Sequence, residues 1–456
     1  MQHLDTSFAA LSFLITLICL TMLIWRLVTD SFIDSTLPIV SSDTHCDNNI
    51  YTSEEDRKLT QRLKYLNSSF SSFKLHESID ILIKIIPFFL INRIFIFTIN
   101  LLFYMSENGD KTLGHDYLMR IWGKWDTVNY LSIAQHGYQS SGDDRFLIVF
   151  YPLYPFLLHI FEKFTGDYFL SGLAVSNIFL IISLFYIYRL VLLELKEEEI
   201  AFKSVKYILI FPFSFFFSIV YAESLFICLC IMTFYFLRKK NWLLSGLMGF
   251  LAALTRTQGI LLLIPIVTEI LYEYRGFNKN TQDNIHKKKP AMYLQIIACL
   301  ILVPFGTFGY LLINKFVSGE WLTFLIYQRE HWGQKFGFFA ENVKNGFIYI
   351  FAMDKTMSIN VWIPQTFLFF MSLGILMYTA KNLRVSYVLF SFAYILMSFS
   401  PTWLLSGSRY ITGMFTLFIM LAIFVYKHKY LEVYLDFALT MMLCFYCIQF
   451  SLSRVY

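Results

Sequence analysis

The sequence predicts an all-α protein, a polytopic bundle of transmembrane helices, and three observations support that prediction. Hydrophobic residues make up 57% of the 456 residues, and 50 residues are phenylalanine. Charged residues make up only 15%, whereas a soluble globular chain averages about 25%. Apolar runs of span length recur along the chain. Because a helix satisfies its own backbone hydrogen bonds, a bilayer is the natural solvent for such a sequence.

Most of these runs match the roughly 20 residues that a helix needs to cross a bilayer. Two longer blocks, 207–237 and 242–274, are interrupted by polar residues near their middles, at Tyr221-Ala-Glu-Ser224 and Thr255-Arg-Thr-Gln-Gly259. We therefore expect each block to form a hairpin of two short helices. The single runs lie at about 7–28, 79–104, 168–193, 291–316, 362–380, 385–400, 410–426 and 431–452.

Lysine and arginine cluster in loops that the positive-inside rule places in the cytoplasm. All clusters lie on one side of the membrane only if both long blocks are hairpins. With that arrangement the chain crosses the membrane about 12 times, and both of its ends lie outside. Loops 105–167 and 317–361 then also lie outside. The clusters are 57–74, Lys196/Lys203/Lys206, Arg238-Lys239-Lys240, Arg275 to Lys289, Lys381/Arg384 and Lys427/Lys429.

Two segments do not follow the simple pattern of spans. The run 148–161 is short and holds two prolines, so we expect a re-entrant or interfacial helix there. Residues 1–78 divide into a retained anchor span and a polar cytoplasmic loop. The span has no preceding Lys or Arg and no following cleavage site, which argues against a signal peptide. Residues 79–456 then form the main domain.

Several function classes are excluded or disfavoured. There is no basic, aromatic-interleaved stripe for nucleic acid, no GxxxxGK[ST] and no GxGxxG, which argues against nucleotide-driven transport and sugar-nucleotide enzymes. Six of the seven cysteines lie in apolar segments, and Cys46 is the exception. Cys444 and Cys447 have CxxC spacing inside an apolar helix, where packing is the favoured interpretation. We expect no disulfide framework and no metal site.

The densest polar signal is the stretch 122–138, WGKWDTVNYLSIAQHGY, in the first outer loop. Helical spacing places Asp126 and Tyr130 on one face, and Gly137 ends the helix. His136 and Tyr138 then lie at that end.

An acid, an imidazole and aromatic rings at a membrane surface suit sugar chemistry. A carboxylate such as Asp126 can take the proton from an acceptor hydroxyl as it attacks an anomeric carbon. Flat rings such as Trp125 stack on sugars and also anchor at the interface. The alternative is an ordinary interfacial helix with a satisfied aspartate.

Three charged residues lie in apolar surroundings near the outer ends of predicted helices: Glu223, Arg256 and Arg409. Charges at membrane depth usually line a cavity or pair with one another. The planar fork of arginine suits a lipid phosphate, because it bonds two oxygens at once. A structural Glu223–Arg256 ion pair between neighbouring hairpins is the alternative.

The second outer loop holds Tyr327-Gln-Arg-Glu-His-Trp-Gly333, with Glu330 and His331. Alone it is a weak signal. The predicted topology places it on the same side as Asp126, and its spacing matches no zinc motif.

Taken together, these stretches resemble the PIG-V family, GPI mannosyltransferase 2 and its prokaryotic relatives, over about residues 80–456. QREHWG and the YPLYP of residues 151–155 are closer to the prokaryotic members. The matching pieces are Asn92-Arg93, WD-x₃-Y-x₂-IA-x-HGY (125–138), FYPLYPFL (150–157), FPFSFFFSIVYAESLF (211–226), LTRTQGILLL (254–263), QREHWG (328–333) and SRY (408–410).

The resemblance implies a GT-C membrane fold, a polyprenyl-phosphate sugar donor, and inverting transfer to a lipid or glycan acceptor outside the cytoplasm. Asp126 would be the general base, and Arg256 and Arg409 would hold the donor phosphate. GT-C enzymes often use a divalent cation, although no ligand cluster here demands one. The sugar and acceptor pocket would be shaped by Trp125, Tyr130, His136, Tyr138, Glu223, Glu330 and His331.

Two other functions stay open at this point. A transporter or flippase of a lipid-linked sugar predicts inverted repeats and charges at the midplane, whereas the charges here gather at outer helix ends. A non-catalytic subunit of a glycosylation complex would tolerate loss of Asp126. The membrane would be the plasma membrane in a prokaryote and the endoplasmic reticulum in a eukaryote.

Overall fold

The computed structural model describes the backbone of residues 55–108, 117–279 and 290–456. Over these residues the chain is helical, and the one β-pairing described is an isolated bridge between Phe336 and Pro401. The predicted all-α fold class is confirmed. The predicted span at 7–28 and Cys46 lie outside the described residues.

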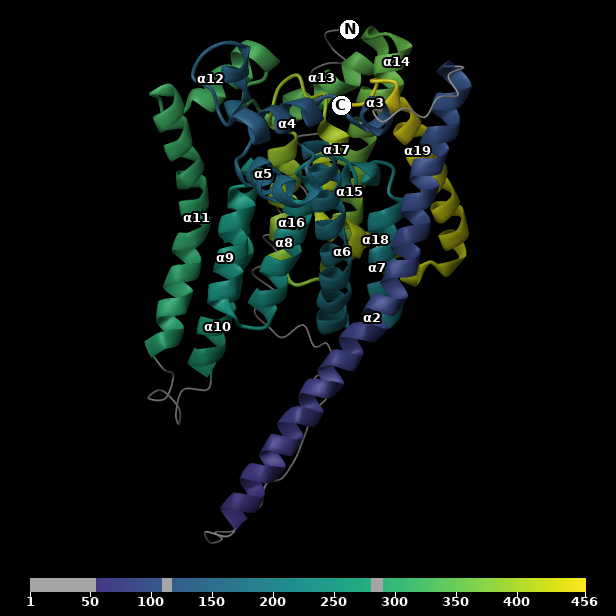
Figure 1. The fold of residues 1–456 in the computed structure, drawn as a ribbon. Coiled ribbons are helices and arrows are strands. Elements are labelled where there is room, and N and C mark those ends of the chain that lie inside the picture. The colour runs from purple at the N-terminus through teal and green to yellow at the C-terminus, as the bar shows by residue number, and fades with distance from the viewer. Residues whose placement is uncertain (1–54, 109–116, 280–289) are drawn as a thin grey trace.

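Five described helices are long and apolar enough to cross a membrane, and each falls on a predicted run. They make the chain an integral membrane protein. Figure 1 shows them side by side with shorter helices that run in the same direction, so the number of crossings stays a prediction. The five are α2 (Glu55–Asn108), α6 (Tyr168–Leu195), α11 (Pro290–Ser318), a helix at 355–382 that contains α15 (Ile363–Thr379), and one at 429–451 that contains α19 (Glu432–Ser451).

Both long apolar blocks turn near their middles as predicted, but the first helix of the first hairpin begins at Glu198, before the predicted block, and ends at Ile210. The first consists of α7 (Glu198–Ile210) and α8 (Glu223–Arg238), with the 3₁₀ turn η2 (Ser214–Phe217) between them. The second consists of α9 (Trp242–Ala253) and α10 (Leu263–Lys279), joined through η3 (Thr257–Leu262). The second polar interruption, 255–259, lies in its turn, whereas in the first hairpin residues 211–222 form the turn and Glu223 already begins α8.

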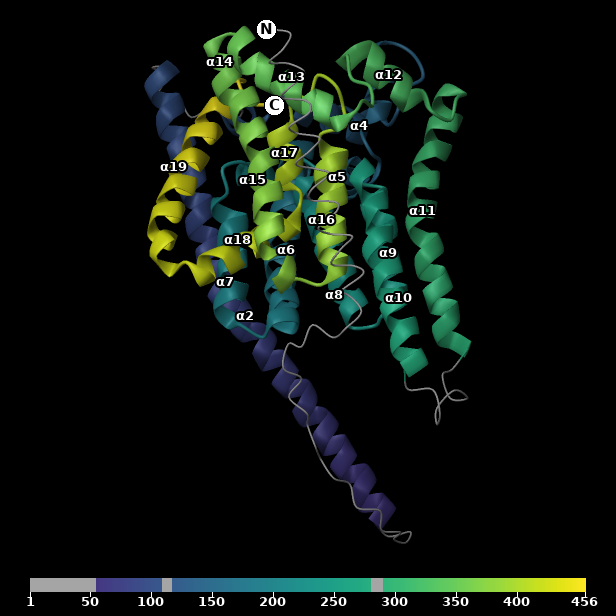
Figure 2. The same cartoon turned by 180° about the vertical axis from the view of Figure 1, so that it is seen from behind.

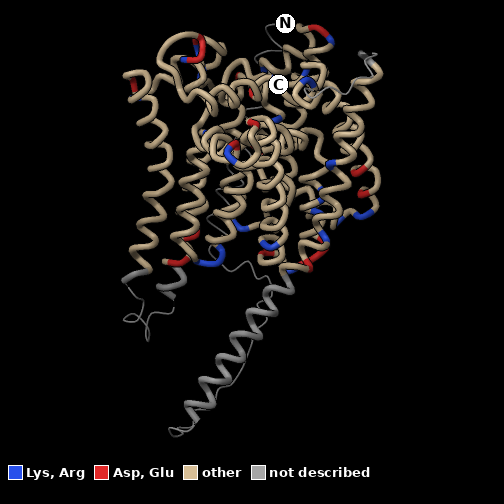
Figure 3. The backbone as a smooth tube through the Cα atoms, in the orientation of Figure 1, with Lys and Arg blue, Asp and Glu red and all other residues tan. Residues whose placement is uncertain are grey.

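The four described clusters of lysine and arginine, at 196–206, 238–240, 381–384 and 427–429, lie toward one end of the bundle (Figure 3). Acidic partners neutralise them there: Lys206 lies 2.7 Å from Asp436, and Arg384 lies 3.2 Å from Glu269. The short helices α4 (Asp126–His136), α12 (Thr323–Trp332), α13 (Phe339–Ala352) and α17 (Gly407–Thr412) lie at the opposite end, which we call the outer end (Figure 1).

The predicted re-entrant segment is bent. The 3₁₀ helix η1 (Asp143–Val149) and α5 (Leu153–Thr165) meet at 110°, the geometry of a broken span or a re-entrant loop. The bend is held from two sides: Tyr310 of α11 donates a hydrogen bond to the Ile148 carbonyl (2.8 Å), and Tyr154 of α5 shares one with Ser176 of α6 (2.8 Å).

One sequence prediction needs correction. Residues 55–78 were expected to belong to a polar loop, but they form the first part of α2. The segment EDRKLTQRLKYL has strong helix formers and no glycine or proline, so it can continue a helix without an apolar environment. Figures 1 and 2 show this part of α2 reaching beyond the other helices.

Candidate active site

A cavity of about 880 Å³ lies at the outer end of the bundle. Its wall combines α4, the bend between η1 and α5, the first residue of α8, the α9–α10 turn, α12 and the chain around α17. Segments separated by hundreds of residues therefore face one chamber. Its charged and amide-bearing side chains are Asp126, Asn129, Glu223, Arg256, Gln258, Gln328, Arg329, Gln334, Lys335 and Arg409.

Helix α4 places Asp126 and Tyr130 on the cavity wall, as the helical spacing predicted. The helix begins at Asp126, where a carboxylate is favoured by the helix dipole. It ends before Gly137, whose φ of 69° suits glycine. Trp125 also lines the cavity and has a φ of 50°, which a non-glycine residue rarely adopts. Burial, with the nearby carboxylates, holds the pKa of Tyr130 well above its ordinary value, so its hydroxyl stays neutral.

Four charged side chains form a continuous network in the wall. Arg409 Nη1 lies 2.6 Å from Asp126 Oδ2, and Arg409 Nε lies 3.2 Å from Glu223 Oε1. Arg256 donates to the same Glu223 oxygen. Two acids and two bases compensate one another, which a buried charged group requires. The Glu223 side chain is 2% exposed and that of Asp126 is 20% exposed, so Asp126 is the more accessible carboxylate.

The position of Glu223 follows from the buried turn between α7 and α8. Residues 211–222 are buried throughout, and Tyr221 at their end donates a hydrogen bond to the Lys124 carbonyl (3.2 Å). The same hydroxyl accepts one from the backbone N–H of Asp126 (3.3 Å). The turn thus ties the start of α8 to the start of α4, which brings Glu223 and Asp126 to one arginine.

Two further cations line the cavity, Arg329 on α12 and Lys335 just after it. Neither makes an ion pair within the described part of the chain, and both are exposed. The four basic groups in the wall therefore outnumber the two acidic ones. The cavity carries excess positive charge, which favours an anionic ligand. The sequence prediction missed both cations, although Arg329 belongs to the QREHWG motif.

The residues predicted at the far end of α4 do not line the cavity. His136 is exposed there, ten residues from Asp126, and ten residues of helix span about 15 Å. Tyr138 donates a hydrogen bond to the Phe150 carbonyl (2.6 Å), and burial raises the pKa of its hydroxyl.

Glu330 and His331 of α12 also lie outside the cavity wall. Both are exposed, and the His331 ring stacks on Phe146 with 4.5 Å between centroids. Gln328, Arg329 and Trp332 of the same motif line the cavity instead. The motif thus contributes to the site through other positions than the predicted ones.

The described residues of the cavity do not form a ligand set for a divalent cation. Among the described residues, no group of three or more His, Cys, Asp or Glu could hold a metal ion. The two carboxylates of the cavity are engaged by Arg409 and Arg256, and hard cations need several oxygen ligands free of competing charge.

Residues 151–308 match the family model described as dolichyl-phosphate-mannose-protein mannosyltransferase. The match covers less than half of the chain; it includes Glu223 and Arg256 but neither Asp126 nor Arg409. The match supports a membrane glycosyltransferase, but it does not single out the PIG-V family.

A solved structure with a similar backbone is the Archaeoglobus fulgidus oligosaccharyltransferase in complex with Zn and sulfate. The two chains are 11% identical, with a TM-score of 0.40, over 77% of this chain and 53% of the archaeal one. This chain thus spans about half the length of that protein. A comparison with curated protein sequences finds no match.

Proposed function

We propose that this chain is a GT-C glycosyltransferase that moves a hexose, mannose in the first instance, from a polyprenyl-phosphate donor to a lipid- or glycan-linked acceptor. The family match over residues 151–308 supports the mannosyl-phosphate donor. One observation supports the activity most directly: a single cavity at the outer end holds an accessible carboxylate beside an excess of cationic groups.

The reaction assigned to the cavity needs one base and one anion site. Asp126 accepts the proton of the acceptor hydroxyl, whose oxygen forms a bond to the anomeric carbon of the donor sugar. The bond from that carbon to the phosphate oxygen breaks, and the polyprenyl phosphate leaves with the electron pair. This leaving group carries its own negative charge, so no acid has to protonate it.

The arginines would act on that leaving group by electrostatics. Arg409 orients Asp126 through the 2.6 Å contact and presents its positive charge to the cavity. Arg256, Arg329 and Lys335 line the same chamber and would hold the phosphate before and after transfer. Fixed cations in a partly enclosed site stabilise developing charge without reorganising.

An apolar part of the wall would accept the first isoprene units of the donor. Phe324, Leu325 and Ile326 of α12 line the cavity, and the last two are exposed large hydrophobic residues. A lipid chain could therefore remain among apolar side chains while its phosphate reaches the cations. On the positive-inside rule this end is the non-cytoplasmic one.

The decisive experiment is transfer of radiolabelled mannose from polyprenyl-phosphate mannose in membranes containing the protein, with lipid and glycan extraction to find the acceptor. Asp126→Asn keeps the size of the side chain but cannot accept the proton. We expect turnover to fall about 10²–10⁴-fold, the usual effect of losing a general base, while donor binding persists.

Asp143→Asn is the matched control, because Asp143 is an exposed carboxylate of the same outer loop that does not line the cavity. It should keep full activity. Equal losses in both variants would contradict the role of Asp126. Donor binding by the unmodified protein without any transfer would favour the transporter instead.

A further inference from the structure

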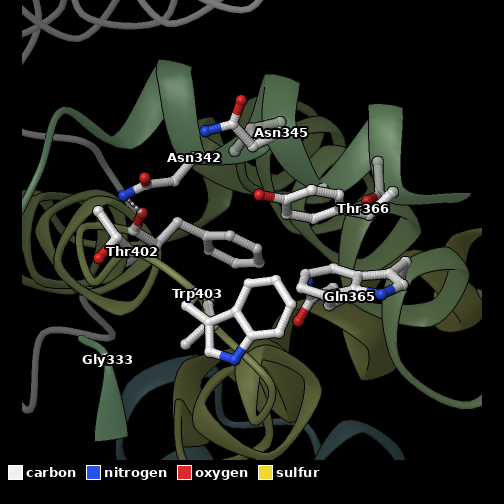
Figure 4. A pocket seen from close by; sticks show the side chains of 13 residues that line it. Gly333, Asn342, Asn345, Gln365, Thr366, Thr402 and Trp403 are labelled. Carbon is white, nitrogen blue, oxygen red and sulfur yellow. Dashed lines mark hydrogen bonds between the residues drawn. The ribbon is translucent and has the colours of Figure 1, made fainter. Parts of the chain in front are cut away.

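A second pocket, of about 210 Å³, lies beside the active-site cavity and takes no part in the chemistry above. We call it the outer pocket. Its walls come from α13, the first turns of α15 with the preceding π-helix η4 (Ser358–Trp362), and the loop that leads to α17. Figure 4 shows Asn342, Asn345, Gln365, Thr366, Thr402 and Trp403 around its central space.

The chemistry of the wall is uncharged and suited to hydroxyl groups. No charged side chain is among the residues that line the pocket. Amides and hydroxyls supply both donors and acceptors, as a sugar ring with several hydroxyls requires. Aromatic rings supply flat apolar faces, the kind of surface on which the C–H face of a sugar packs. The rings are Tyr349, Trp362, Phe399 and Trp403.

Two polar atoms of the wall are buried without a hydrogen-bond partner. Gln365 is 3% exposed and Trp362 is 1% exposed, yet Gln365 Oε1 and Trp362 Nε1 have no partner in the structure. Each atom has less than 1 Å² of accessible surface, so neither borders the open space of the pocket. The polar contacts to a ligand would therefore come from the accessible amides and hydroxyls of the wall.

Hydrogen bonds join the segments that form the wall of the outer pocket. Asn342 donates to the carbonyls of Phe399 (3.0 Å) and Ser400 (2.7 Å), which ties α13 to the loop before α17. The N–H of Thr402 donates to the Lys335 carbonyl (2.8 Å). Gly346 completes the shape, because a Cβ there would lie 3.3 Å from Thr366 Oγ1 and would narrow the space.

The outer pocket and the active-site cavity share a thin partition. Gln334 and Leu405 line the cavity, while their neighbours Gly333 and Leu404 line the outer pocket. Gln334 Nε2 donates to the carbonyl of Trp403 (3.1 Å), so it links the two sides. A ligand held in the outer pocket would therefore lie beside the cavity whose wall includes Asp126.

From these observations we infer that the outer pocket binds one neutral, hydroxyl-rich ring, a monosaccharide unit of the acceptor. Sites for larger ligands span roughly 300–1,000 Å³, so 210 Å³ suits a single ring. The absence of charge from the wall favours a neutral sugar over a sugar phosphate or a uronic acid. The saccharide-binding site stands on its own geometry, while its assignment to the acceptor rests on the proposed function.

Binding to the purified full-length protein in detergent tests the inference without turnover. Tryptophan fluorescence is titrated with methyl α-mannoside and methyl α-glucoside as neutral probes, and with mannose 6-phosphate as the charged probe. We expect saturable binding of a neutral probe and at least about tenfold weaker binding of the charged one, a difference equivalent to one good polar contact. Equal or tighter binding of the charged probe would overturn the inference.

Two variants and a matched control locate the site. Trp403→Ala removes an aromatic face and Gly346→Ala narrows the outer pocket, and each should weaken neutral-probe binding about tenfold. Trp321→Ala is the control, because Trp321 and Trp403 are both 41% exposed and Trp321 lines neither cavity. If both pocket variants bind the neutral probe as well as the unmodified protein, or if the control loses as much affinity, the sugar does not bind in the outer pocket.

The transfer assay separates this inference from the proposed activity. If both hold, Trp403→Ala raises the KM for the acceptor and leaves donor binding unchanged. If the pocket variants lose sugar binding but the unmodified protein transfers nothing, the saccharide site stands and the proposed activity fails. If transfer proceeds with an unchanged acceptor KM in both variants, the activity stands and the acceptor role of the pocket is wrong.

Discussion

Glu223 and Asp126 play different parts although both bind Arg409. Glu223 is almost fully buried and forms ion pairs with both Arg256 and Arg409, so it joins the two arginines of the network. Asp126 makes one contact to Arg409 and faces the cavity. The structural ion pair and the catalytic assignment were alternatives on sequence grounds. The geometry is compatible with both interpretations. The Glu223–Arg256 ion pair belongs to the same network that holds Asp126, the proposed base, through Arg409.

Glu223→Gln should therefore damage folding more than Asp126→Asn does. The amide keeps the shape but leaves Arg256 without its acidic partner and Arg409 with Asp126 alone, and breaking a buried ion pair costs about 3–5 kcal/mol. The thermal unfolding midpoint of the purified protein in detergent measures the effect. Glu341→Gln is the control, since Glu341 is exposed and its ion pair with Lys344 is long, at 3.9 Å. A midpoint as high as that of Glu341→Gln would contradict the structural role of Glu223.

Sequence reasoning could select the charged residues of the site because each is costly in an apolar helix. Glu223, Arg256 and Arg409 carry that signal individually, and the structure brings them together with Asp126. His136 and Glu330 carried a weaker signal, nearness to a motif, and the structure places them off the cavity wall. Nearness along a helix differs from nearness in space, because side chains a few residues apart point in different directions.

At the scale of elements, α9 and α11 pack closely through glycines. A Cβ on Gly246 of α9 would lie 2.7 Å from Cys299 Cα, and one on Gly249 would lie 2.6 Å from Val303. On the α11 side, a Cβ on Gly306 would lie 2.4 Å from the Phe250 carbonyl oxygen. Small residues that let helix backbones approach are the usual means of helix association in membranes.

Gly306→Ala should destabilise the protein, because the new methyl group meets backbone atoms that cannot turn away. Overpacking of this kind costs about 1–3 kcal/mol. Gly309→Ala on the same helix is the matched control, since its Cβ would lie 3.6 Å from Leu254 Cδ2, an ordinary contact. Unfolding midpoints of both variants in detergent test the difference, and a Gly306→Ala midpoint equal to that of Gly309→Ala would refute the close packing.

The hairpins could be predicted because each apolar block is too long for one span, and polar residues near its middle are less costly in a turn than inside a membrane helix. The partition between the two pockets could not. It includes the hydrogen bond from Gln334 to the Trp403 carbonyl, and these two residues lie in separate loops and share no local pattern. The outer pocket was missed for a related reason: its amides and aromatic rings are uncharged and so do not stand out in a hydrophobic sequence.

Over the whole molecule, charge is handled differently at the two ends. At the end opposite the cavity, lysines and arginines from several loops pair with acids of neighbouring helices, for example Lys429 with Glu199 at 2.9 Å and Lys240 with Glu273 at 2.7 Å. At the outer end, Arg329 and Lys335 of the cavity wall make no such pair with any described residue. The first arrangement suits an anchoring surface facing the cytoplasm, and the second suits a site that receives an anionic lipid.

This asymmetry predicts the orientation in the membrane. Single cysteines at Asp143→Cys and His331→Cys should react with an impermeant maleimide added to the non-cytoplasmic side of intact cells or sealed vesicles. Lys429→Cys, exposed at the other end, should react only after permeabilisation. The background needs Cys19, Cys46 and the partly exposed Cys444 replaced by serine, while Cys228, Cys230, Cys299 and Cys447 are buried.

The two outer positions test different loops, so agreement between them carries the conclusion. Asp143 belongs to the loop that holds Asp126, and His331 belongs to the loop that holds Arg329. If one position reacts from each side, the two loops lie on opposite sides of the membrane. That result would contradict a cavity formed by both loops. If both positions react only from the cytoplasm, the two loops still share one cavity, but the cavity faces the cytoplasm. The positive-inside rule would then have given the wrong orientation for this protein.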